Sequence, residues 1–512
     1  MKKIIQRVTT STRTTQIIRT MKISAFLLLV SVFPVIVSTA YSQDGEVVFK
    51  QKKTGQNIFA NNSDSVFFTT GFKIGEVTDT SVIIWTRLCK NQKPVPIKHL
   101  RKEAPFRSPI DFDNNMPVNE MEGAVEGSLG QVKITISSKG KTVSTEWEYV
   151  SADKDYTLKK KINGLQSNTA YTVLLQGRKD EKSPIAEKIG QFRTAPRNNE
   201  IIPVTFTANS DQYFWDYDDS LRGFKIYDNM MKLKPLFHCE QGDFVYYDKK
   251  GPTVNTIEMA RHDWHAMNSW PSLVDFYSKV PLYIQKDDHD ALRDDATPKI
   301  APLGEVSFSD GVRIWQEQMP VIGKPYRTFR WGKDLQIWLV EGREFRSENS
   351  DPDGPEKSLW GKEQKQWFVE SIKSSDATFK LLMSPTPVVG PDRGVGKKDN
   401  LANDAWKTEG DWLRKFLSEQ KNTYVINGDR HWQYVSKDIK TGLMEFDHGP
   451  ASDSHAQGWS QDDLRPEHKF LRVKGGFLGV NIYREKNVPF IKFTLYDVDG
   501  NKVHEDIIKA IL

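Results

Sequence analysis

Five short apolar runs in the second part of the chain constrain its fold most strongly. They predict β-strands, with amphipathic segments between them, at residues 202–206, 236–240, 282–285, 335–340 and 424–426. This alternation is typical of an α/β domain, in which helices cover β-sheets. Each run is followed almost at once by acidic, His, Asn or Arg residues. Because ligands of α/β sheets bind beyond the carboxyl ends of the strands, we expect these residues to meet in one crevice.

An all-β module is expected ahead of the α/β domain. Between residues 67 and 197, short apolar stretches alternate with Gly, Asp and Asn turns, and no long helical period occurs. The segment 165–171 is similar to the tyrosine corner of an immunoglobulin-like or fibronectin type III sandwich, with Tyr171 as its tyrosine. Residues 91–128, rich in Pro, Glu and Asn, are expected to form a long loop inserted into this sandwich.

The start of the chain is typical of a secretory signal peptide. Residues 1–42 contain six basic residues and no acidic one, and a mostly apolar run at 23–37 precedes several small residues. The apolar run is shorter than the roughly 20 residues of a membrane-spanning helix, although a retained anchor is an alternative. We therefore expect a signal peptide at 1–42, an N-terminal segment at 43–66, the sandwich at 67–197 and the α/β domain at 198–512. The mature protein would be secreted or periplasmic, or would lie at the cell surface.

Charge and cysteine content narrow the function classes. The formal net charge of +5 comes from the six basic residues of the leader, so the rest of the chain is nearly neutral and no nucleic-acid binding is expected. Two cysteines, Cys89 and Cys239, are too few for a disulfide scaffold, and neither has a metal-binding spacing. Whether they pair stays open, as does the oligomeric state. Any metal ion would need oxygen and imidazole ligands.

Three acidic or histidine clusters follow three of the predicted strands. They are Gly242-Asp243-Phe244-Val245-Tyr246, Asp287-Asp288-His289-Asp290 and Gly428-Asp429-Arg430-His431. Each by itself is a common kind of turn, but so many charges in one crevice would repel each other without a cation. Together they predict a centre of two metal ions, which would activate a water molecule or hydroxide for in-line attack on an ester. Such a centre favours neutral to alkaline pH, because the water must first lose a proton.

The ordered clusters resemble the alkaline phosphatase D (PhoD-like) branch of the calcineurin-like metallophosphoesterases. Residues 341–346 (Glu-Gly-Arg-Glu-Phe-Arg) and the helix opening at 359–368 resemble two further segments of that family. The resemblance covers nearly all of residues 67–512. It implies an α/β fold of four layers, a β-sandwich flanked by helices, with an N-terminal all-β fibronectin type III/Ig-like domain. It also implies a secreted metal-dependent phosphatase that acts on small or polymeric phosphate mono- or diesters. The short apolar run of the leader, with no later apolar segment of spanning length, predicts no stable membrane insertion.

The resemblance assigns metal ligands position by position. Asp243 would bridge the two metals, Tyr246 would bind as a phenolate, and Asp288 would bind the second metal, with Asp287 as the competing choice. Asp429 and His431 would each give a ligand to one metal. The set that the resemblance implies is thus Asn209, Asp243, Tyr246, Asp287, Asp288, Asp429 and His431.

Asn209 is the main departure from the family pattern. Aligned on Phe206, it stands where the family has an iron-binding cysteine thiolate, although Asp211 could turn inward and supply the charge instead. A neutral amide is a poor Fe(III) ligand, and hard oxygen donors favour Ca, Mg or Mn. We therefore expect two or more metal ions, drawn from Ca, Mn, Mg and Fe.

Two residues receive catalytic roles from the resemblance. His289 would protonate the leaving oxygen or donate a hydrogen bond to it, and Arg343 would bind phosphate oxygens, because a guanidinium fork suits a bidentate oxyanion. The other histidines receive less direct roles. His262 and His265 are expected on a helix at the surface or in a pocket wall, and His448 and His455 flank a loop that would shape the substrate site.

Two alternative functions stay open. The first is a non-catalytic surface or carbohydrate-binding protein on the same fold, which the missing cysteine favours and the retained acidic and histidine residues oppose. The second is an esterase that acts on a different ester, such as a sulfate or a polysaccharide.

Overall fold

The computed structural model describes residues 35–41, 47–53, 64–393 and 396–512, which belong to two compact units, 1–61 and 62–512. In the first unit, β1 (Val35–Tyr41) and β2 (Val47–Lys53) pair as an antiparallel hairpin. Most of the predicted signal peptide, residues 1–34 and 42, lies outside the described residues. Among the helices of the described residues, none combines the length and the hydropathy required to cross a membrane.

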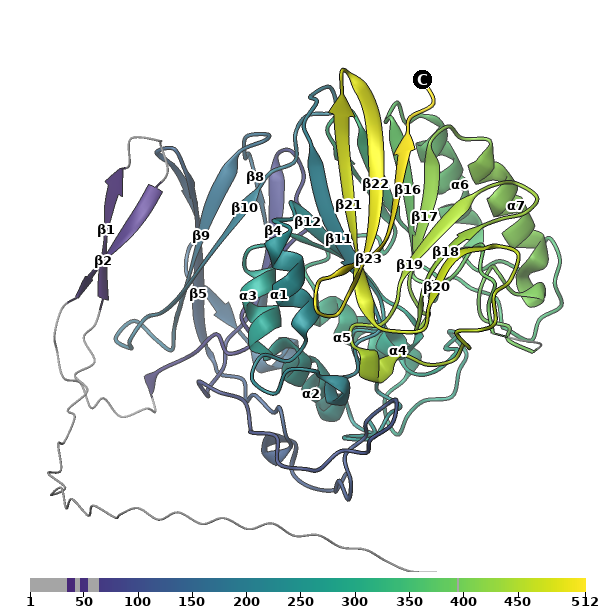
Figure 1. The fold of residues 1–512 in the computed structure, drawn as a ribbon. Helices are drawn as coiled ribbons and strands as arrows, with labels where there is room; N and C mark the ends of the chain where they lie inside the picture. The colour runs from purple at the N-terminus through teal and green to yellow at the C-terminus, as the bar shows by residue number, and fades with distance from the viewer. Residues whose placement is uncertain (1–34, 42–46, 54–63, 394–395) are drawn as a thin grey trace, which may run out of the picture. The chain divides into compact units, whose positions relative to one another are not determined.

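Two large mixed β-sheets form the centre of the second unit (Figure 1). The nine-stranded sheet has the order β23 (Lys502–Lys509), β22 (Val488–Asp497), β21 (Gly476–Glu485), β11 (Val204–Asn209), β12 (Phe237–Gln241), β13 (Leu282–Gln285), β3 (Phe72–Gly75), β4 (Ser81–Arg87) and β8 (Thr157–Asn163). The seven-stranded sheet has the order β14 (Arg327–Trp331), β15 (Leu335–Leu339), β16 (Phe379–Ser384), β17 (Thr423–Asn427), β19 (Met444–His448), β18 (Gln433–Lys437) and β20 (His468–Arg472).

The two sheets pack face to face through a buried apolar core. Phe206 and Phe237 of the first sheet share this core with Ile337 and Leu381 of the second. Period-two alternation explains the arrangement, since Phe206 and Ala208 of β11 point to this core while Thr207 and Asn209 point to the opposite face.

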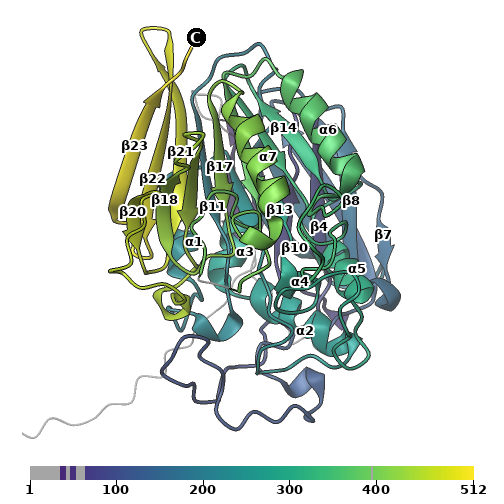
Figure 2. The same cartoon turned by 90° about the vertical axis from the view of Figure 1, so that its right-hand side faces the viewer.

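Helices cover the outer faces of both sheets (Figure 2). On the nine-stranded sheet, a second core forms beneath α1 (Lys225–Lys232), α2 (Ile257–Asn268), α3 (Pro271–Tyr277), α4 (Asp288–Ala291) and α5 (Phe308–Gln318). On the seven-stranded sheet, α6 (Gly361–Lys373) and α7 (Lys407–Ser418) bury Phe368 and Leu413 against a third core. The four layers, helix, sheet, sheet and helix, are those of the predicted α/β fold.

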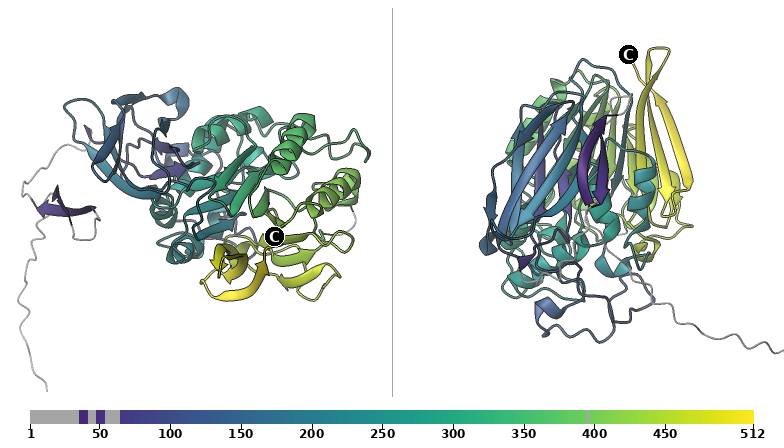
Figure 3. Two further views of the ribbon diagram at one scale, coloured as in Figure 1. Left: turned by 90° about the horizontal axis from the view of Figure 1, so that it is seen from above. Right: turned by 90° about the vertical axis from the view of Figure 1, so that its left-hand side faces the viewer.

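The region of the predicted N-terminal sandwich contributes a further sheet of five strands (Figure 3). Its strands are β10 (Ala186–Arg193), β9 (Ala170–Arg178), β5 (Gly130–Ser138), β6 (Lys141–Ser144) and β7 (Glu148–Val150). This sheet packs on β3, β4 and β8 around Ile84, Ile134 and Val173. The backbone N–H of Gln166 donates to the Tyr171 hydroxyl at 2.8 Å, within the predicted tyrosine corner.

The predicted sandwich region, residues 67–197, also extends the nine-stranded sheet of the α/β domain. β3 pairs in parallel with β13 through Gly75 and Leu282, so β3, β4 and β8 continue the nine-stranded sheet. Residues 67–197 and the α/β domain at 198–512 therefore share one sheet, although the sequence predicts them as separate modules.

Candidate metal centre

The turns after β11, β12, β13 and β17 carry the candidate ligands, so both large sheets contribute to one site. Asp211, Asp243 and Asp429 have positive φ angles of 57°, 54° and 65°. Gly242 also has a positive φ, and a Cβ at this position would lie 2.6 Å from that of Asp287, so only glycine fits the turn. The clusters that follow separate strands are therefore in contact.

Asp290 fixes the turn that contains Asp243. Its carboxylate accepts hydrogen bonds from the backbone N–H groups of Asp243 (2.7 Å), Phe244 (2.8 Å) and Val245 (3.1 Å). The same carboxylate accepts from the N–H of Asp287 at 3.0 Å, within a capping box that begins α4. The Asp290 side chain thereby holds the first cluster (242–246) and the second cluster (287–290) together.

Two groups of potential ligand atoms share Asp243. One contains Asp211, Asp243 and His431, the other contains Asp243, Asp288 and His289, and in each group the ligand atoms lie within 4.8 Å of one another. All five residues are buried. Asp243 thus occupies the position between the two groups, which is where a carboxylate that bridges two cations would lie.

The donor atoms of this centre fit hard cations. Within the described part of the chain, Asp243 Oδ1, Asp287 Oδ2 and His431 Nδ1 are buried and make no hydrogen bond. Burial, followed by the charges of Asp288 and Asp287, raises the pKa of Asp243 well above its usual value. Burial and His455 lower the pKa of His431 to about 3, so its ring is neutral, as a metal ligand must be. A cation would satisfy the unpaired atoms and offset the repulsion among the carboxylates.

Tyr246 contacts the centre through its hydroxyl. The hydroxyl lies 3.3 Å from Asp243 Oδ2 and 3.0 Å from Nε2 of His455. Burial and the charge of Asp243 raise the pKa of Tyr246 well above 10. The phenol therefore keeps its proton unless a cation binds beside it.

His289 is held by an ion pair at the edge of the centre. Its Nδ1 lies 2.7 Å from Asp248 Oδ1. Burial opposes the charged form, but Asp248 and Asp288 raise the pKa of His289 to about 9. An imidazole with this pKa carries a proton that it can donate at neutral pH.

Asp211 and Asn209 lie in different environments. Asp211 Oδ1 is 3.2 Å from His431 Nε2, inside the first group of ligands. The side chain of Asn209 points to the helix-covered face of β11, toward Tyr227 of α1, and its two polar atoms are buried without a hydrogen-bond partner. The position that alignment on Phe206 assigns to the missing cysteine is therefore turned toward α1, and the nearby Asp211 lies at the centre.

Arg343 is fully buried among carboxylates. Its Nε donates to Asp287 at 2.6 Å, and its two terminal nitrogens donate to Asp399 at 2.8 Å each. Arg346 also contacts Asp399, at 3.1 Å. The guanidinium that the sequence assigns to phosphate oxygens is thus engaged by two side chains of the protein.

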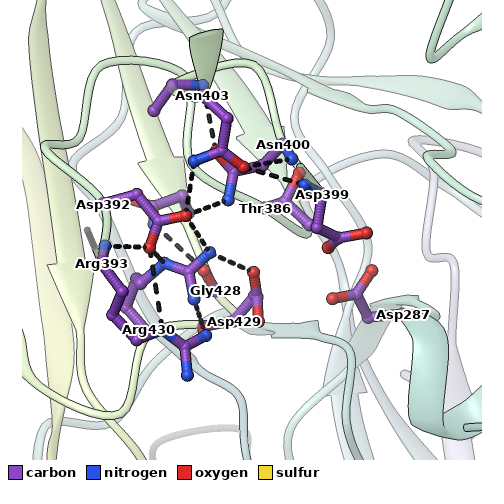
Figure 4. A network of polar contacts seen from close by, with 12 residues as sticks. Asp287, Thr386, Asp392, Arg393, Asp399, Asn400, Asn403, Gly428, Asp429 and Arg430 are labelled. Carbon is purple, nitrogen blue, oxygen red and sulfur yellow. Dashed lines mark hydrogen bonds and ion pairs between the residues drawn. The ribbon is translucent and has the colours of Figure 1, made fainter. Parts of the chain in front are cut away.

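Another buried arginine, Arg430, forms an ion pair with Asp429 (Figure 4). Arg430 lies 2.7 Å from Asp429 and 3.0 Å from Asp392. Asp392 in turn accepts from Asn400 at 2.9 Å and from Asn403 at 2.8 Å. This network orients the predicted ligand Asp429, as Arg343 orients Asp287.

The four histidines to which the sequence gives less direct roles, His262, His265, His448 and His455, have different locations. His455 joins the centre, because its ring lies 4.4 Å from that of His431 and its Nδ1 is 2.8 Å from the buried Asp216. His448 bonds Gln241 beneath the site at 3.2 Å. His262 and His265 of α2 contact Glu122 and Asp155, which belong to the predicted sandwich region at residues 67–197.

Comparison with known proteins identifies the family. The model of the PhoD-like phosphatase family matches residues 211–465, and the model of the PhoD-like phosphatase N-terminal domain matches residues 52–196. Alkaline phosphatase D of Bacillus subtilis (strain 168) is 23% identical over 434 residues, and the match covers 74% of this chain and 66% of that protein. The chain thus spans slightly less than two thirds of that relative.

Solved structures of low identity share the fold. A PhoD structure superposes with a TM-score of 0.65 at 18% identity, covering 89% of this chain and 90% of that one. The purple acid phosphatase PPD1 from yellow lupin (Lupinus luteus) superposes with a TM-score of 0.60 at 11% identity, covering 90% and 77% of the two chains. The two family models show that the chain belongs to the PhoD-like phosphatase family.

Proposed function

We propose that this chain is a secreted, metal-dependent phosphoesterase that hydrolyses phosphate mono- or diesters. The observation that carries the proposal is that Asp243 shares one group of ligand atoms with Asp211 and His431 and a second with Asp288, at the ends of strands from two sheets. The membership of the family supports a hydrolase of this kind. The leader at 1–42 supports secretion, and the Tyr171 hydrogen bond supports a fibronectin type III-like fold for residues 67–197.

The proposed metal ligands divide into two sets. Asp211, Tyr246 and His431 serve one ion, Asp288 and Asp429 serve the other, and Asp243 serves both. When bound, such ions supply an activated water molecule and stabilise charge on the ester oxygens. The donors are mostly carboxylate oxygens, which favour Ca, Mg or Mn over iron.

The remaining roles belong to residues around the ligands. His289 donates a proton to the leaving oxygen, and Asp248 holds its ring in place through Nδ1. Arg343, whose donors are taken by Asp287 and Asp399, positions Asp287 and the turn that begins α4. We therefore assign Arg343 a positioning role in place of the phosphate contact that the sequence implies.

Asp243→Asn tests the proposal. Because loss of a residue outside the ligand set of a metal site already costs about 10- to 100-fold, we expect loss of the shared ligand to reduce metal-dependent hydrolysis of nitrophenyl phosphate more than 100-fold. The thermal melting of the metal-free variant should match or exceed that of the wild type, since one repelling charge is removed. Asp462→Asn, an exposed position, is the matched control. Unchanged hydrolysis in the Asp243 variant would refute the proposed centre.

A further inference from the structure

A short hairpin at residues 100–110 brings one aromatic side chain to the metal centre. The N–H of Ile110 donates to Leu100 O at 2.7 Å, and the N–H of Lys102 donates to Ser108 O at 3.1 Å. An antiparallel bridge joins Arg101 and Pro109. The hairpin lies within the segment 91–128 that the sequence predicts as a long loop, and Phe106 is near its tip.

The hairpin is anchored to the turn after β11. Arg101 donates to the carbonyl of Trp215 at 2.5 Å, and its guanidinium lies 3.7 Å from the ring centroid of Tyr217. The N–H of Arg107 donates to Asp216 Oδ1 at 2.8 Å, while Oδ2 of the same carboxylate bonds His455. The backbone next to Phe106 is therefore tied to a carboxylate that also orients a residue of the centre.

The Phe106 ring packs edge-on against residues of the centre. Its centroid lies 4.4 Å from that of His455 and 5.7 Å from those of Tyr246 and His431. Phe106 as a whole residue is partly exposed. Phe106 has a φ of 52°, a left-handed conformation that a bulky residue adopts only where its surroundings hold it. The hydrogen bonds of Arg101 and Arg107 and the packing of the ring against His455 hold it in this conformation.

Phe106 and the proposed proton donor flank the same tyrosine. The His289 ring centroid lies 4.3 Å from that of Tyr246. Lys249 lies near both Phe106 and the ion pair of His289. Its Nζ is 5.0 Å from the Phe106 ring centroid and 3.3 Å from Asp248, the partner of His289. The rings of Phe106, Tyr246 and His289 thus form one contiguous row beside the ligand residues.

We propose that Phe106 is a specificity-determining residue whose ring contacts the alcohol part of the ester, so that esters of flat aromatic alcohols are preferred over those of small aliphatic alcohols. The inference rests on the proposed function, in which the ester is bound at the metal centre with its leaving oxygen beside His289. The alcohol carbon is bonded to that oxygen, so the alcohol group lies near His289, and we place it along the row of rings that ends in Phe106. Contact between two aromatic rings strengthens binding by roughly 3- to 10-fold.

Binding of two phosphonates to the full chain tests this proposal. Phenylphosphonate and methylphosphonate mimic monoesters without being hydrolysed, and calorimetry gives their affinities for the metal-loaded protein. The phenyl-to-methyl affinity ratio of the wild type should fall about 3- to 10-fold in Phe106→Ala and stay unchanged in Phe106→Tyr. Leu100→Ala, an exposed position of the same hairpin, is the matched control and should also leave the ratio unchanged. Phe106→Leu, which keeps the bulk of the side chain without the aromatic ring, serves if the Ala variant does not fold.

The outcomes separate this proposal from the function on which it rests. If the wild type hydrolyses nitrophenyl phosphate but the affinity ratio is equal in the wild type and in the Ala or Leu variant, only the role of Phe106 is overturned. If the wild type neither binds the phosphonates nor hydrolyses the ester with any metal ion, both are overturned.

Discussion

At the scale of single residues, Asn209 and Asp211 are two positions apart in the sequence, but their side chains point to different parts of the protein. Asn209 ends β11 and points toward α1, whereas Asp211 lies in the following turn against His431. Strand alternation alone predicts that Asn209 and Phe206 have opposite orientations. The turn that directs Asp211 inward depends on a positive φ of 57°, which no local pattern in the sequence indicates.

The pair gives a direct test of ligand assignment. Asp211→Asn should weaken metal binding by at least about 10-fold, because a charged ligand becomes neutral. Asn209→Ala should leave metal affinity within about 2-fold, since its side chain faces α1. Titration of the chelated protein with Mn²⁺ or Ca²⁺, followed by calorimetry, measures both. Equal weakening in the two variants would contradict the assignment of Asp211.

Arg343 allows a second test at this scale. Arg343→Gln leaves the buried Asp287 without its cation and Asp399 with Arg346 alone, so the free energy of unfolding should fall by about 3–5 kcal/mol. Urea denaturation of the metal-free protein measures the loss. A variant of unchanged stability that binds phosphate more weakly would instead support the phosphate contact implied by the sequence.

At the scale of elements, a buried polar cluster joins the predicted sandwich region, residues 67–197, to α2 and α5. Asp155 accepts from Arg87 of β4 at 3.1 Å and from Gln318 of α5 at 2.7 Å, and it also pairs with His265 of α2. Burial opposes ionisation of Asp155, but His265 and Arg87 hold its pKa well below the usual range. Burial and Arg87 lower the pKa of His265 to about 4.

This cluster predicts a loss of stability on acidification. As the pH falls from about 6.5 to about 4, the unfolded chain takes up a proton on His265 that the folded protein does not, so the folded state loses up to about 3 kcal/mol. His265→Gln removes this contribution, and its free energy of unfolding should depend less on pH over that window than that of the wild type. Urea denaturation at several pH values measures the difference, and parallel curves for the two proteins would contradict the prediction.

The secondary structure was more predictable than the pairing of the strands. All five predicted strand runs correspond to β11, β12, β13, β15 and β17, because runs of apolar residues between turns carry a strong local signal. Their division between two sheets, and the pairing of Gly75 with Leu282, depend on contacts between distant segments that periodicity does not encode. The approach of Phe106 to His455 is unpredictable for the same reason.

At the scale of the whole molecule, both sheets are needed to assemble the centre. Asp211, Asp243 and Asp288 follow strands of the nine-stranded sheet, and Asp429 and His431 follow β17 of the seven-stranded sheet. Face-to-face packing around Phe206, Ile337 and their neighbours brings the strand ends together. The apolar core between the sheets therefore sets the geometry of a site composed mainly of charged groups.

The central claim is that these charged groups hold metal ions that hydrolyse phosphate esters. The most direct measurement is hydrolysis by the full chain of nitrophenyl phosphate monoesters, diesters and sulfates, after chelation and after readdition of Ca²⁺, Mg²⁺, Mn²⁺ or iron. We predict that chelation abolishes turnover of a phosphate ester, that Ca²⁺, Mg²⁺ or Mn²⁺ restores it, and that sulfates are not hydrolysed. Absence of phosphate ester turnover with every ion, in protein shown to be folded, would contradict the account.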